Sequence, residues 1–280
     1  MDSKTGYATF ISVVNTLAVM AFFVQFPLGS RIKQLPLFAN IDWSIKRHKQ
    51  VGQWIGIIFL LHPVFILAPR FLMSFQDGLD SVIKVLTAPQ MLTGLIAWVL
   101  MIVWVLLSIF KEKLPMRYET WRLMHVLGFV AITILVTLHL TSVGQHGQFQ
   151  QGFNIFWWAL CGFSLIMVAY NYLVKPARLQ KQPFTLQKVE RVSSSDWMVT
   201  VESEQGNNFH FEAGQFVWLN SSDSSYDVDQ HPFSIASCQH DLPKISFIIR
   251  ELGDYTSNLE KLNIGQQVYI DGPYGDDEFK

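Results

Sequence analysis

The chain has few charged residues and almost no cysteine. Only 15% of its 280 residues are Asp, Glu, Lys or Arg, against roughly 25% in soluble domains. The formal net charge is −1, so the composition offers no basic surface for nucleic acid. The two cysteines, Cys161 and Cys238, lie far apart in the sequence, which argues against a disulfide framework or a structural zinc site. What the chain has instead is hydrophobic residues, which make up half of it.

These residues gather in five segments, each long enough to cross a bilayer, which takes about 20 apolar residues. The segments are 7–28, 50–69, 88–110, 123–143 and 153–174. The first is too long for a signal-peptide core and has no clear small-residue cleavage site, so we expect a membrane helix there. Pro63 predicts a kink in the second helix. The fold class predicted for residues 1–178 is an all-α transmembrane bundle of about five helices.

Basic residues predict how this bundle is oriented. Lys and Arg gather in the connections after the first, third and fifth segments, whereas the loop 144–152 carries no charge. The connection after the second segment has Arg70 and Lys84, offset by Asp77 and Asp80. Because short cytoplasmic loops carry the excess of basic residues, we expect the N-terminus outside and the C-terminal part in the cytoplasm. The predicted location is the plasma (inner) membrane.

Two of the segments each carry a widely spaced pair of histidines. His48 and His62 lie 14 residues apart, and so do His125 and His139. On a helix, 14 steps of about 100° and 1.5 Å bring the second ring to within about 40° of the first and about 21 Å along the axis. Each helix should therefore present two imidazoles on one face, with His48 and His125 at the inner level and His62 and His139 at the outer level.

A single histidine in a membrane helix is either functional or a hydrogen-bonded core residue. Four histidines at matched spacing on two helices indicate haem ligation, because a b-type haem needs two axial imidazoles and an apolar slot. Zinc suits the pattern less well, since no carboxylate or thiol accompanies the histidines. Two such haems, one above the other, would conduct electrons across the bilayer without binding a substrate at the metal.

Other residues of the bundle have two readings. Gly52, Gly56 and Gly128 would let a porphyrin lie close to the backbone, and for Gly52 and Gly56 the alternative is ordinary helix packing. Phe59 lies near the histidine-bearing face of its helix, where it would sit between the haems or simply pack.

The composition changes from about residue 181. Short alternating segments at 184–192, 197–202, 215–219, 244–250 and 267–271, separated by turn signals, predict a small antiparallel β-barrel over residues 179–280. A helix is expected over 256–262, with Thr256 as its N-cap. The whole is therefore predicted to be a multi-domain membrane protein.

Two motifs on the predicted barrel suit FAD. His231, Pro232, Phe233 and Ser234 form the first, in which Pro232, Phe233 and Ser234 offer a flat apolar wall and a hydrogen bond for an isoalloxazine. The second runs from Ile249 to Thr256. Its Arg250 and the backbone from Gly253 to Thr256 offer a forked cation and N–H groups for a pyrophosphate. Taken singly, the motifs would be an ordinary strand with a proline and a solvated arginine.

The motifs together resemble the ferric reductase and NADPH oxidase superfamily, over nearly the whole chain. The resemblance implies an inner haem on His48 and His125 and an outer haem on His62 and His139. It also implies FAD against His231, Pro232, Phe233 and Ser234, with Arg250, Gly253 and Thr256 on its phosphates. In the oxidases the paired histidines fall on the third and fifth helices, whereas here they fall on the second and fourth, so this chain looks short by one N-terminal helix of the family pattern.

In this superfamily a turn like 271–275 leads into a nucleotide-binding α/β domain, but here the sequence stops at Lys280. No strand, glycine-rich turn and helix follow that would bind NAD(P)H. We expect either a shortened form of a longer protein or a separate polypeptide that delivers the electrons.

The function that the resemblance implies is an NAD(P)H oxidase or ferric reductase. Electrons from NAD(P)H would pass through FAD and two b-type haems to an outer acceptor, either oxygen, giving superoxide, or a ferric chelate. The loop 144–152, with His146, offers no clear acceptor site. Two alternatives are a cytochrome b subunit that serves a quinol or a partner enzyme, with the barrel as a docking module, and a membrane anchor without a redox role.

Overall fold

The computed structural model describes residues 6–32, 36–38, 40–143, 151–204 and 209–275. The chain forms two compact units. The first consists of Met1–Ile32 and Trp43–Val168, and the second of Lys33–Asp42 and Ala169–Lys280.

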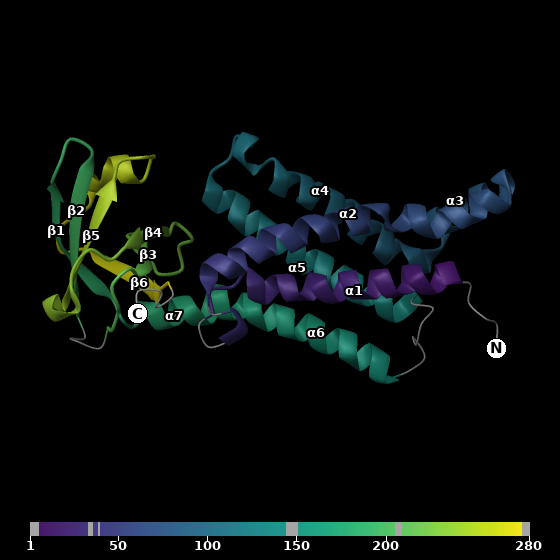
Figure 1. Cartoon of the computed structure of the whole chain (residues 1–280), viewed down its shortest axis with the longest axis horizontal. Helices are drawn as coiled ribbons and strands as arrows, with labels where there is room; N and C mark the ends of the chain where they lie inside the picture. The colour runs from purple at the N-terminus through teal and green to yellow at the C-terminus, as the bar shows by residue number, and fades with distance from the viewer. Residues whose placement is uncertain (1–5, 33–35, 39, 144–150, 205–208, 276–280) are drawn as a thin grey trace. The chain divides into compact units, whose positions relative to one another are not determined.

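The first unit is a bundle of long apolar helices that run lengthwise beside one another (Figure 1). They are α1 (Gly6–Leu28), α2 (Ile41–Met73), α4 (Leu92–Ile109), α5 (Tyr118–Val143) and α6 (Gln151–Ala169). Among the described residues, five helical stretches are long and apolar enough to cross a membrane. The five predicted membrane helices are thus confirmed, and the two histidine pairs lie on α2 and α5.

The segment between α2 and α4 differs from expectation. It was expected to be a loop, but residues Phe75–Thr87 form a further helix, α3. Ser74 caps this helix, because its hydroxyl accepts a hydrogen bond from the Asp77 N–H at 3.0 Å. The helix has only 13 residues and mixes apolar with charged positions, so a search for long apolar runs passes over it. Helix α2, for its part, continues through Pro63 from Ile41 to Met73.

Aromatic side chains fill the middle of the bundle. Phe22 of α1 is 2% exposed and makes edge contacts with Phe59 of α2 at a centroid distance of 6.1 Å. It also lies 6.2 Å from Phe129 of α5. Phe59 packs against both buried clusters of the bundle, so packing is the role that its surroundings show. Many large hydrophobic side chains on the outer faces are exposed, as expected for helices that are surrounded by lipid.

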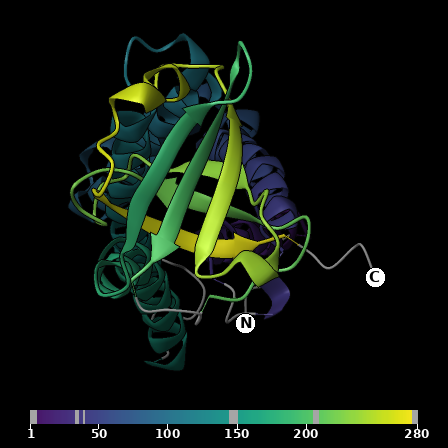
Figure 2. The same cartoon turned by 90° about the vertical axis from the view of Figure 1, so that its left-hand side faces the viewer.

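The second unit contains six antiparallel strands, seen in Figure 2. The strands are β1 (Phe184–Arg191), β2 (Asp196–Ser203), β3 (Phe216–Asn220), β4 (His231–Ser234), β5 (Lys244–Arg250) and β6 (Gln267–Tyr274). Five of them correspond to predicted strands, and their alternating apolar residues, such as Val199, Val217 and Phe247, form a fully buried core.

The small antiparallel domain is confirmed, but its barrel is not closed. The strands lie in the order β4-β3-β6-β1-β2-β5, and the segment just after β4 reaches β5 through an isolated bridge between Ile235 and Phe247. The short edge strand β4 contains Pro232, which has no N–H for a further ladder bond. This proline limits how far β4 can pair.

A buried polar cluster fastens the helix α7 (Lys175–Gln180) to the sheet within the second unit. Lys175 Nζ lies 3.3 Å from Asp271 Oδ2 and 3.2 Å from the Tyr274 hydroxyl. The Tyr274 hydroxyl donates to Asp271 Oδ1 at 2.5 Å. All three residues are at most 9% exposed. A five-residue π-helix, Tyr170–Val174, precedes α7.

Candidate haem and flavin sites

The inner histidines face each other across the bundle. The ring centroids of His48 on α2 and His125 on α5 are 6.2 Å apart, with an interplanar angle of 66°. Two imidazoles that share one metal through nitrogens about 2 Å from it have ring centroids roughly 6 Å apart. The spacing therefore fits two axial ligands of one iron.

Helix α1 orients the first of these rings. His48 Nδ1 lies 3.2 Å from the carbonyl oxygen of Gln25. A carbonyl can only accept, so Nδ1 carries the proton and donates it, which leaves Nε2 as the free nitrogen for a metal. A Cβ built at Gly29 would lie 3.4 Å from the His48 ring, so the end of α1 packs against that ring.

His125 is enclosed by α4 and α5. Its Nδ1 lies 3.0 Å from the Ser108 hydroxyl, and the rings of Trp121 and Phe129 have centroids 5.0 Å and 4.7 Å from its own. A small cavity lies beside it, lined by Trp104, Leu107, Ser108, Met116, Trp121, Met124 and His125.

The outer histidines are His62 on α2 and His139 on α5. Both Nδ1 atoms are buried, and none of the described groups makes a hydrogen bond to them. Gly94 of α4 lies directly against His139, since a Cβ built there would be 2.5 Å from Cε1 and Nδ1. This glycine makes room for the ring.

The inner histidines, His48 and His125, come together as a pair. Among the described residues no group of three or more His, Cys, Asp or Glu could hold a metal ion. Zinc sites use three or four protein ligands, whereas a haem iron needs only two axial ones. The donor set at each level therefore fits haem.

The glycines that were considered as porphyrin contacts lie against side chains. A Cβ built at Gly128 would be 1.7 Å from Trp104 Nε1, and one at Gly56 would be 3.1 Å from Val105. Gly52 faces the side-chain oxygen of Gln25 at 3.4 Å. Gly56 and Gly128 thus serve close packing between helices.

In the second unit, the first FAD motif is divided between two faces of β4. His231 and Phe233 are half-buried, whereas Pro232 and Ser234 are exposed, as the alternation of a strand requires. His231 stacks on Tyr255 with a centroid distance of 3.9 Å, and Phe233 lies 6.1 Å from the same tyrosine.

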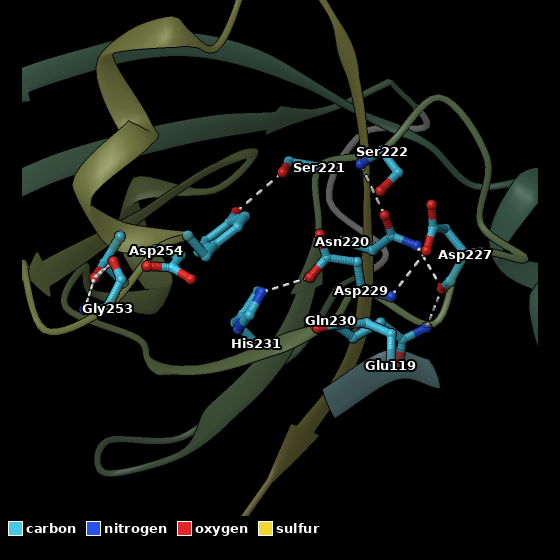
Figure 3. A network of polar contacts seen from close by, with 12 residues as sticks. Glu119, Asn220, Ser221, Ser222, Asp227, Asp229, Gln230, His231, Gly253 and Asp254 are labelled. Carbon is cyan, nitrogen blue, oxygen red and sulfur yellow. Dashed lines mark hydrogen bonds and ion pairs between the residues drawn. The ribbon is translucent and has the colours of Figure 1, made fainter. Parts of the chain in front are cut away.

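Polar contacts hold this stack, as Figure 3 shows for His231 and Asp229. His231 Nε2 lies 2.7 Å from Asp229 Oδ1. The Tyr255 hydroxyl donates to Ser221 Oγ at 3.1 Å, and burial raises the pKa of that tyrosine above its usual value. The stack gives the domain a flat aromatic surface.

The second FAD motif lies at the end of β5. Ile249 is 1% exposed and belongs to the core. Arg250 Nε donates to Asp196 Oδ1 at 2.9 Å, and this bond holds the pKa of the Asp196 carboxyl below its usual range. The Arg250 side chain remains 65% exposed, so its guanidinium can still meet a phosphate from solution.

The backbone expected to bind the pyrophosphate is already bonded. The Thr256 hydroxyl accepts from the N–H groups of Leu252 at 2.8 Å and Gly253 at 3.1 Å. Thr256 begins a six-residue 3-10 helix, Thr256–Lys261, in place of the expected α-helix. A phosphate would have to compete with the Thr256 hydroxyl for the Gly253 N–H.

The sequence reasoning overlooked several residues that now adjoin the sites: Gln25, Gly94, Ser108 and Tyr255. Tyr255 lies inside the second motif, and its position among polar residues could have indicated a role in the site. Ser108 is a lone hydroxyl near the end of an apolar helix, which was also visible. Gly94 and Gln25 gave no signal, because only packing brings them to a histidine.

Two family models match the chain. Residues 10–136 match the ferric reductase like transmembrane component, and residues 182–278 match an FAD-binding domain. The matches confirm the resemblance to ferric reductases and NADPH oxidases, and with it the predicted class of protein, a helical membrane part followed by an FAD-binding domain.

Curated relatives agree with this class. The chain is 27% identical over 172 residues to a heavy chain of the superoxide-generating NADPH oxidase of Dictyostelium discoideum, covering 61% of this chain and 23% of that protein. It is 26% identical over 269 residues to the respiratory burst oxidase homolog protein F of Arabidopsis thaliana, covering 83% of this chain and 26% of that protein. The chain thus matches about a quarter of the length of these relatives.

Among solved structures, the chain is similar to the ferredoxin reductase in carbazole 1,9a-dioxygenase. The identity is 18% and the TM-score 0.30, covering 34% of this chain and 28% of that one.

Proposed function

We propose that the chain carries electrons through the membrane from a flavin to an acceptor on the other side. The observation that carries this proposal is the 6.2 Å separation of the His48 and His125 rings, on two helices that each hold a second histidine 14 residues further on. His48 and His125 would hold the inner haem b, and His62 and His139 the outer one.

When bound, FAD would turn a hydride from NAD(P)H into single electrons, and the haem irons would carry one electron each. The four histidines would hold the two haem irons through their imidazoles, so an acceptor would be reduced without binding to the metal. Phe22 packs against Phe59 of α2 and Phe129 of α5, so apolar side chains would surround the path of the electrons. Oxygen and ferric chelates are the acceptors proposed, as in the relatives' class.

The FAD site proposed for residues 179–280 uses both motifs. His231, Pro232, Phe233 and Ser234 would contact the flavin ring, and Arg250, Gly253 and Thr256 would meet its phosphates, with Ile249 supporting them from the core. The stack of His231 on Tyr255 and the exposed guanidinium of Arg250 support this site. Electrons from NAD(P)H would reach it through a nucleotide-binding domain or a partner reductase.

The proposed setting is the plasma (inner) membrane, with residues 1–178 as the transmembrane di-haem domain, the N-terminus outside and the FAD domain in the cytoplasm. The basic residues after the first, third and fifth membrane segments support this orientation. A test is cysteine labelling from either side of sealed vesicles, in which Cys238, exposed on the second unit, should react only from the cytoplasmic side.

The His62→Ala variant tests the haem assignment. We expect the purified variant to retain one haem per chain and its FAD, because His62 lies at the outer level only. His240→Ala, at an exposed position of the second unit, is the matched control and should retain both haems. A His62→Ala protein that keeps two haems and loses flavin would contradict the assignment. Bound FAD would also exclude the alternative in which the second unit only docks a partner.

A further inference from the structure

The Ser108 hydroxyl lies between the Trp104 carbonyl oxygen and His125 Nδ1, and it can bond to both in only one arrangement of protons. It donates its single proton to the Trp104 carbonyl oxygen at 2.7 Å, and it also lies 3.0 Å from His125 Nδ1. Because the hydroxyl proton is already used, the serine oxygen must accept a proton from Nδ1. This arrangement makes His125 the Nδ1–H tautomer and directs Nε2 to the metal.

A hydrogen bond from Nδ1–H does more than orient the ring. It makes the imidazole a stronger electron donor, and a stronger donor stabilises the ferric form of an axially bound iron. We propose that Ser108 is a positioning residue for the inner haem, which fixes the tautomer of His125 and lowers the reduction potential of the iron. This inference rests on the proposed function, since it assumes that His125 ligates a haem.

Among the hydrogen-bond partners of the ligand histidines, Ser108 is the one that a side-chain substitution can test. At His48 the corresponding acceptor is the backbone carbonyl of Gln25, which no side-chain substitution removes. At the outer level, none of the described residues makes a hydrogen bond to Nδ1 of His62 or His139. The hydroxyl of Ser108 is therefore the one side-chain acceptor for a ligand histidine within the described part of the bundle.

A matched set of variants separates the effect of the Ser108 hydroxyl from the effect of side-chain volume. Ser108→Thr keeps the hydroxyl, and Ser108→Val has the same shape as threonine without it. Ser164→Ala is the control elsewhere in the bundle. Ser164 is also a buried helical serine that donates to the carbonyl four residues earlier, that of Leu160, at 3.0 Å, but among the described residues it makes no hydrogen bond to a ligand histidine.

The experiment is a spectroelectrochemical titration in the His62→Ala background, where the inner haem is the single haem expected. At the potential where this haem is half reduced, we expect Ser108→Val to raise the ferrous-to-ferric ratio about threefold, a size that part of one neutral hydrogen bond provides. Ser108→Thr and Ser164→Ala should leave the ratio unchanged. Loss of haem from Ser108→Val but not from Ser108→Thr would also support the role of the hydroxyl.

Three results would overturn the inference while the haem itself is present. They are an unchanged ratio in Ser108→Val, an equal shift or an equal loss of haem in Ser108→Thr, and an equal shift in Ser164→Ala. Absence of haem from the unaltered protein would instead refute the proposed function. The two failures are thus distinguished by the haem content measured before the titration.

Discussion

Adding a single methyl group at Gly94 should remove the outer haem. A Cβ built there lies 2.5 Å from Cε1 and Nδ1 of His139, whereas carbon atoms in contact lie about 3.5–4.0 Å apart. The ring would have to move by about 1 Å, twice the roughly 0.5 Å within which a binding constellation must be held. By comparison with other changes around metal ligands, we expect the Gly94→Ala variant to bind the outer haem at least about tenfold more weakly.

The assay is the number of haems per purified chain, with FAD content measured in the same sample. Gly162→Ala is the matched control, because Gly162 lies inside α6 and a Cβ there would meet nothing within 4 Å. Replacing glycine by alanine within a helix stabilises it by about 0.5–1 kcal/mol, so a loss of haem from Gly94→Ala alone cannot come from a weaker helix. Two haems of unaltered affinity in Gly94→Ala would refute the placement of His139.

Three further predictions concern the second unit. Lys175→Met should destabilise it by about 3 kcal/mol in urea unfolding followed by flavin fluorescence, because Asp271 stays buried without its cation; an unchanged midpoint would mean that the cluster contributes nothing. The pKa of Asp196 is lowered in the folded protein, so its ionised carboxylate stabilises the fold at pH values above the ordinary carboxyl pKa. This stabilisation is lost as the pH falls through the pKa that Asp196 has in the folded protein. The temperature of thermal unfolding should therefore decrease when the pH is lowered below about 4. In Asp196→Asn this decrease should be smaller. Tyr255→Ala should weaken FAD binding about tenfold through loss of its stacking, whereas Tyr255→Phe should bind FAD normally in a fluorescence titration.

The sequence predicted the parts of the fold that depend on hydrophobic periodicity. Long apolar runs gave the five membrane helices, and short alternating runs gave five of the six strands. Helix α3 was missed because its charged positions, such as Asp77 and Asp80, break the apolar run, although the Ser74 cap was present in the sequence. The short strand β4 was read only as a motif, since Pro232 is a poor strand former.

The candidate sites were predictable where the signal was a residue type at a regular spacing. The histidine pairs fall into this class, because 14 residues on a helix fix both the face and the level of each ring. The contacts that orient those rings were not predictable. Ser108 lies on a different helix from His125, and the carbonyl of Gln25 carries no side-chain signal at all. Such contacts follow from how the helices pack, which a single sequence does not show.

The central claim is that two membrane helices hold two haems through four histidines and receive electrons from a flavin. The most direct test is the absorption spectrum of the purified, unaltered chain before and after dithionite, with haem and flavin counted per chain. We predict two six-coordinate b-type haems and one FAD. A colourless protein, or one whose haem content does not change when any of the four histidines is replaced by alanine, would contradict the claim.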